Sequence, residues 1–130
     1  MAELDAEHDA CAAALAELAR TRSVDTLRAL IKLYEAHFAH EEALCDAYVY
    51  QRTVDPGDAS SFNADENARK SHYADHARLL DALREQAACG DAQVPAAFID
   101  ATLRGFEGHA NRYDDAYAPR LAAALAAGAG

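Results

Sequence analysis

The sequence predicts an all-α protein, an antiparallel up-down-up-down four-helix bundle. Alanine supplies 34 of the 130 residues and is the best helix former. Valine, isoleucine and threonine are scarce, which argues against a sheet. Four segments carry apolar residues at spacings of three and four, and turn residues separate them. A chain of this length makes one domain, so we expect residues 1–130 to form a single bundle.

The helix limits follow from apolar spacing and from turn chemistry. We expect helices at about residues 4–20, 25–50, 63–89 and 95–125. Asp5 is the predicted N-cap of the first helix, and Asn63 with Glu66 forms a possible capping box at the start of the third. The second helix shows the clearest apolar stripe: Leu27, Leu30, Ile31, Tyr34, Phe38, Leu44 and Tyr48.

The connections are predicted from glycine and proline. The stretch RTVDPGDASSFN, with Pro56 and Gly57, indicates a loop that is long for a bundle. Gly90 suits the position just after the third helix, and Pro95 suits the first position of the fourth. Pro119 is expected to end or kink the fourth helix.

Composition excludes several classes of partner. The formal net charge is −10, and the basic residues form no patch, so neither nucleic acid nor an anionic membrane surface is an expected partner. No apolar stretch approaches the ~18 residues of a membrane span, and the acidic N-terminus does not resemble a signal peptide. The three cysteines form no CxxC, which favours a reduced, cytoplasmic setting. Nothing points to a particular protein partner.

Histidines lie on all four predicted helices. His37 and Glu41 are four residues apart, as are His72 and His76, so each pair shares one helix face. In an antiparallel bundle two such pairs meet from opposite walls, and the first and fourth helices add His8 and His109. The joint pattern predicts a metal site, although imidazole alone does not choose between iron, copper, zinc and nickel.

Asp114 fits this site only if the fourth helix is distorted. It follows His109 by five residues, which is about 140° around a straight α-helix. A π-bulge would absorb the extra residue, and such bulges concentrate at functional sites. The sequence therefore predicts non-ideal helical hydrogen bonding between His109 and Asp114.

The motifs LDAEH, HFAHEE, HYADH and HANRYDDAY resemble those of the hemerythrin family over nearly the whole chain. The resemblance implies a core diiron centre with two iron ions joined by an oxo or hydroxo bridge. One iron would be bound by His72, His76 and His109, the other by His8 and His37, and Glu41 and Asp114 would bridge both. Such a set leaves one coordination position open, on the iron with two histidines.

By the same resemblance the chain would bind dioxygen reversibly, for transport, storage or delivery. Ferritin-like oxidases use ExxH motifs, and this sequence has none. Three further residues are candidates for the ligand pocket: Phe106, Cys45 and Tyr117. His40 is expected not to bind metal.

Competing functions remain open on the sequence alone. The chain could be a sensor of oxygen, redox state or nitric oxide that acts through a partner, or a diiron enzyme that uses peroxide or nitric oxide. It could also be a zinc or iron buffer. No separate acid–base pair or nucleophile is evident, so we expect a binding protein rather than an enzyme.

Overall fold

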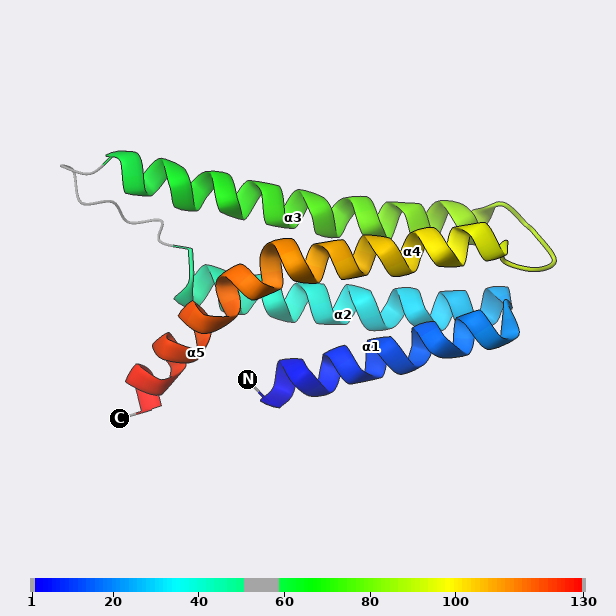
Figure 1. The fold of residues 1–130 in the computed structure, drawn as a ribbon, viewed down its shortest axis with the longest axis horizontal. Helices are drawn as coiled ribbons and strands as arrows, with labels where there is room; N and C mark the ends of the chain where they lie inside the picture. The colour runs from blue at the N-terminus through cyan, green and yellow to red at the C-terminus, as the bar shows by residue number, and fades with distance from the viewer. Residues whose placement is uncertain (1, 51–58, 130) are drawn as a thin grey trace.

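The computed structural model describes residues 2–50 and 59–129, and within them every element is helical and there is no strand (Figure 1). The elements are α1 (Ala2–Thr21), α2 (Val24–Tyr48), α3 (Ala59–Ala88), α4 (Ala96–His109), the π-helix η1 (Ala110–Asp114) and α5 (Asp115–Ala129). Because α4, η1 and α5 follow one another without a break, the chain forms four helical rods. The predicted helical bundle is confirmed.

The rods lie side by side and alternate in direction along the chain (Figure 1). Helix α1 packs on α2, α2 packs on α3, and α4 contacts both α1 and α3. After η1 the last rod changes direction, and α5 packs against α2. A π segment and a proline are both recognised causes of helix bending, and this rod has both.

The α1–α2 turn is tied to the α3–α4 turn at the same end of the bundle. The backbone N–H of Val94 donates to the Arg22 carbonyl at 2.8 Å, and Arg22 Nε donates back to the Val94 carbonyl at 2.8 Å. Arg22 has a φ of 54°, which is unusual for a residue other than glycine. The two hydrogen bonds hold this conformation. Ser23 then caps α2, and its Oγ accepts from the Thr26 N–H at 3.1 Å.

Two predicted helix starts are wrong. Helix α1 already begins at Ala2, so Asp5 lies inside the helix instead of capping it; alanine and an acidic first turn both favour the earlier start. Helix α3 begins at Ala59, so Asn63 is not an N-cap, and the last part of the predicted loop is helical. The remainder of that loop, residues 51–58, lies outside the described residues.

The predictions for the glycine and the two prolines near helix ends are confirmed only in part. Gly90 follows the end of α3 with a φ of 73°, the left-handed conformation expected there. Pro95 is the N-cap of α4, one position before the predicted one. Pro119 lies inside α5 and does not end it, because a proline removes a single helical hydrogen bond and the residues that follow are mostly alanines.

Two apolar clusters fill the bundle on either side of a polar layer. The larger contains Leu15, Leu18, Leu27, Leu30, Phe38, Leu79 and Leu83, with their neighbours. The smaller contains Leu4, Cys45, Val49, Tyr50, Tyr117 and Leu121. Along α2, Glu41 falls between the residues of the two clusters, and His37 directly precedes Phe38, the last residue of α2 in the larger cluster. The histidine layer is therefore enclosed by apolar packing at both ends.

Gly105 allows close packing of α4 against α3. A Cβ at this position would lie 3.0 Å from Leu79 Cδ2, tighter than most real Cβ contacts, so Leu79 would have to shift. None of the described helices combines the length and apolarity needed to cross a lipid bilayer.

Replacing Ser23 with alanine should destabilise the fold, because it removes the side-chain acceptor at the start of α2. We expect a loss of about 1 kcal/mol in the free energy of unfolding, measured by urea denaturation at fixed metal content. Ser23→Asp keeps an acceptor and should lose much less. Equal losses in the two variants would contradict a capping role.

Candidate metal centre

Two groups of metal-binding side chains meet at Glu41. The first is fully buried and consists of Glu41, His72, His76 and His109. The second consists of His8, His37 and Glu41. Within each group the donor atoms lie within 4.8 Å of one another, and together the groups draw on all four rods. This buried cluster of histidines with a glutamate can hold a metal ion.

The two carboxylate oxygens of Glu41 face different groups. Oε1 lies 2.8 Å from His72 Nε2 and 3.2 Å from His76 Nε2. Oε2 lies 3.0 Å from His37 Nε2 and 3.9 Å from His8 Nε2. The Glu41 side chain, which has no exposed surface, therefore lies between the two sets of histidines and contacts both.

Asp114 spans the same two groups from the last rod. Its Oδ1 lies 3.5 Å from His109 Nε2, and its Oδ2 lies 3.7 Å from His8 Nε2. The π-helix η1 covers Ala110–Asp114, which is where the sequence predicts a distortion. The prediction is confirmed: the wider turn brings Asp114 to the side of the rod that carries His109.

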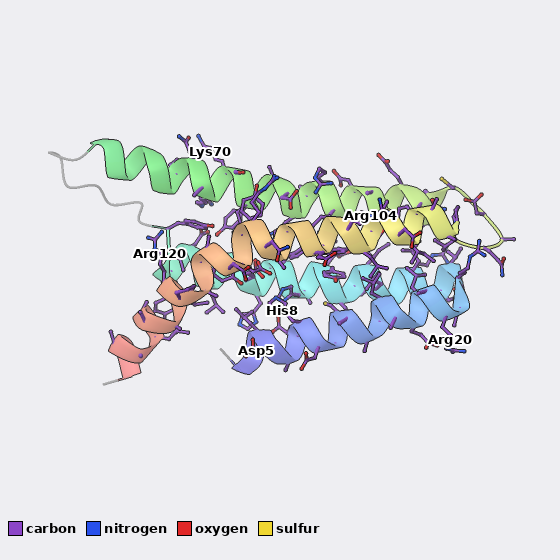
Figure 2. The ribbon with its side chains drawn as sticks, in the orientation of Figure 1. Asp5, His8, Arg20, Lys70, Arg104 and Arg120 are labelled. Atoms are coloured by element: carbon purple, nitrogen blue, oxygen red, sulfur yellow. The ribbon has the colours of Figure 1, made fainter. Side chains whose placement is uncertain are left out.

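His8 completes the set from α1, and Figure 2 shows its side chain pointing from α1 into the bundle. All seven residues that the sequence assigns to the centre thus lie together, because the two donor groups share Glu41 and Asp114 lies beside a histidine of each. His8 is the most exposed of the histidines in the two groups, with 40% of its side chain accessible, whereas Glu41 and His72 are fully buried.

Three buried polar atoms in this cluster make no hydrogen bond: His8 Nε2, Glu41 Oε2 and Asp114 Oδ1. Leaving a buried donor or acceptor unpaired usually costs about 1–3 kcal/mol, and native proteins rarely tolerate it without a reason. Two of the three atoms are carboxylate oxygens and one is an imidazole nitrogen, and atoms of both kinds bind metal ions. Their convergence fits a cation between them.

The electrostatics of the two carboxylates support the same conclusion. Burial alone would raise the pKa of Glu41, but the four surrounding histidines hold it well below its usual range. Burial and the neighbouring charge of Glu41 raise the pKa of Asp114 to about 6. Two carboxylates in one buried space repel each other, and a bound cation would relieve this repulsion.

In each buried histidine, the ring nitrogen that points away from the centre has a hydrogen-bonding partner; we call it the outward nitrogen. The four pairs are His37 with Glu7 at 2.9 Å, His76 with Glu42 at 3.2 Å, His109 with Asp75 at 2.8 Å and His72 with the Tyr50 hydroxyl at 2.8 Å. In each pair the bonded atom of the histidine is Nδ1. Such partners fix the orientation of metal-binding histidines and leave Nε2 free to face the metal.

Sequence analysis missed these four partners. Glu42 and Asp75 stand next to site residues in the motifs HFAHEE and HYADH, so an adjacent acid was the available signal. The spacing does not show which histidine each acid serves: Asp75 directly precedes His76 but bonds to His109 on another rod. Tyr50 had no signal, because it reaches His72 only through tertiary packing.

His40 lies beside the centre but outside both donor groups. Its Nδ1 is 2.6 Å from Glu7 Oε2, and the other oxygen of Glu7 bonds to His37. Glu7 therefore links His40 to the centre.

Cavities border the centre on the His8 side. The larger has a volume of about 360 Å³, and Phe106 lines it, with its ring stacked on Tyr34 at 3.9 Å between centroids. A small cavity of about 50 Å³ lies between α1 and α5, and Tyr117 lines it together with His8 and Asp114. Two of the three predicted pocket residues thus line cavities that reach the centre.

Cys45 is placed differently from the other two candidates. It has no exposed surface and packs with Val49, Tyr50 and Leu121 in the smaller apolar cluster. It belongs to neither donor group, and it is not among the residues that line the larger cavity. Burial, together with nearby carboxylates, raises the pKa of its thiol to about 12, so the sulfur stays protonated. Cys45 is therefore a packing residue of the smaller apolar cluster.

No family model matches the chain, and no match was found among curated proteins or solved structures. The assignment of the centre therefore rests on its own donors, their burial and their hydrogen-bonding partners.

Deleting Asn111, an exposed residue of η1, should preserve metal binding. The deletion brings His109 and Asp114 to a spacing of four, about 40° apart on a regular α-helix, so they still share a face. Deleting Asp100 from α4 is the matched control, because it rotates the part of the rod before the deletion relative to the site by about 100°. We expect metal content, measured by mass spectrometry, to fall only in the control; equal loss in both would contradict this explanation of η1.

Only Cys89 should react with iodoacetamide at pH 8 in the folded chain. The three cysteines are free thiols, and Cys11 and Cys45 are buried; burial raises the pKa of Cys11 to about 11 and that of Cys45 to about 12. Thiolate is the reactive form. Peptide mass spectrometry should find one labelled cysteine in the native state and three in urea. Rapid labelling of Cys45 in the native state would contradict its assignment as a packing residue.

Proposed function

We propose that this chain holds two iron ions between its helices and binds dioxygen there reversibly, as its resemblance to hemerythrins implies. The observation that carries the proposal is the division of the donors into two groups joined by the two oxygens of Glu41. His72, His76 and His109 would hold one iron, and His8 and His37 the other. Glu41 and Asp114 would bridge both.

The unequal surroundings of the two groups support a ligand position on the His8 side. His72, His76 and His109 are buried and enclosed by aromatic rings: Phe38 stacks on His76 at 3.9 Å between centroids, and Tyr113 stacks on His72 at 4.9 Å. The other group has one histidine fewer, and the larger cavity borders it. Both histidines of this group line the cavity, whereas His109 is the one histidine of the first group that does.

When bound, a pair of ferrous ions would supply the electrons and the open coordination position that reversible dioxygen binding requires. The chain's own residues would do the rest. The partners of the outward nitrogens keep the buried histidines oriented with Nε2 toward the metals. The apolar packing at both ends of the layer excludes bulk water, which limits loss of the ferrous state by side reactions.

The central experiment is reversible spectroscopy of the iron-loaded chain. The protein is loaded with ferrous iron without oxygen, exposed to air, and then freed of oxygen again. We expect a visible charge-transfer band that appears and disappears over repeated cycles, with two irons per chain. Irreversible conversion in the first cycle would contradict a carrier, and turnover with added peroxide would favour an enzyme.

His72→Ala and His40→Ala form the matched pair of variants for this experiment. His72 is a fully buried member of the first donor group, so its loss should abolish binding of the iron pair and the reversible band. His40 belongs to neither group, so its loss should leave two irons per chain. Loss of both irons in His40→Ala, with the helical content unchanged, would contradict the proposed set of metal-binding residues.

A further inference from the structure

The cavity on the His8 side is much larger than dioxygen needs. Its volume is about 360 Å³, whereas an apolar cavity of about 150 Å³ already holds benzene. Its walls come from α1, α2 and α4 and are mostly apolar: Ala12, Leu15, Phe38, Leu103 and Phe106. A space of this size and lining matches the pockets that bind small organic molecules.

Tyr34 places one polar group in this apolar wall. Tyr34 is only 7% exposed and lines the cavity, and no hydrogen bond joins its hydroxyl to another described residue. The hydroxyl is not one of the fully buried polar atoms without a partner, so it is accessible from the cavity that Tyr34 lines. Burial raises the pKa of Tyr34, so the hydroxyl stays protonated and can donate. An oxygen atom on a ligand in the cavity would supply the missing acceptor.

The charges around the cavity select against an anion. No lysine or arginine is among the residues that line it, whereas Glu107 and Asp114 are. The chain as a whole carries a formal charge of −10. A negatively charged ligand would therefore meet repulsion without a compensating ion pair.

We propose that this cavity binds a small neutral aromatic molecule that carries a hydroxyl or carbonyl oxygen, with the oxygen accepting a hydrogen bond from Tyr34. Phe38 and Phe106 provide aromatic walls for the ring. The ligand would lie beside His8, His37 and Asp114, which line the same cavity. That this ligand would lie next to a dioxygen-binding centre rests on the proposed function, whereas its binding in the cavity does not.

Phenol and toluene test the role of the hydroxyl, because they match in size and differ in the oxygen. Titration calorimetry of the full chain, with and without iron, should give a dissociation constant for phenol of about 1 mM or below. Tyr34→Phe should weaken phenol by about three- to tenfold, the usual effect of one hydrogen bond, and leave toluene unchanged. Equal weakening of both ligands, or of neither, would overturn the assignment of Tyr34.

Ala12→Phe and Ala13→Phe test the location. Both alanines are exposed on α1, but only Ala12 is among the residues that line the cavity. The substitutions have the same cost in helix propensity. We expect at least a tenfold loss of phenol and toluene binding in Ala12→Phe and no loss in Ala13→Phe. Unchanged binding in Ala12→Phe would place the ligand elsewhere and overturn the proposal.

The two proposals can fail separately. Reversible oxygen spectra in a chain that binds no phenol at 10 mM, about tenfold above the expected dissociation constant, would overturn the aromatic site alone. Phenol binding that responds to Tyr34→Phe and Ala12→Phe, in a chain without a reversible oxygen band, would support the aromatic site and overturn the oxygen function. Binding of both, with phenol altering the charge-transfer band, would support both.

Discussion

Glu41 is a carboxylate with no exposed surface, in the middle of a bundle in which alanine is the commonest residue. A charge in that position is strongly unfavourable unless positive or hydrogen-bonding groups surround it. The chain meets this requirement from all four rods, and histidines from α1, α2, α3 and α4 approach the two oxygens. The relative rotation of the rods is therefore constrained at one level by a single side chain.

The rest of the polar layer extends from that point outward. Behind the buried histidines stand Glu7, Glu42, Asp75 and Tyr50, which contact solvent or the smaller apolar cluster. Connected hydrogen bonds hold the members of a polar network rigidly, whereas unpaired atoms destabilise a core. The three atoms left without partners are all on the inner side of the network. These unpaired atoms therefore all border the space where a cation fits.

The layer is also asymmetric in its burial and in the number of histidines on its two sides. One side is closed by stacked rings and has three histidines; the other has two, a partly exposed His8 and a cavity lined by Tyr34 and Phe106. Closed metal sites are structural, whereas sites with an open position bind or transform ligands. Both proposals for this chain, dioxygen and an aromatic neighbour, depend on this open side.

The sequence by itself determined the helical class, the faces that carry the histidines and the distortion between His109 and Asp114, because these depend on residue spacing along one helix. It misplaced the starts of α1 and α3, where several positions can begin a helix at similar cost. Only the tertiary structure decided that Asp75 serves His109, that Tyr50 reaches His72 and that Tyr34 faces a cavity without a partner. Those contacts join residues from different rods, and their geometry depends on how the rods pack, which spacing within one helix does not encode.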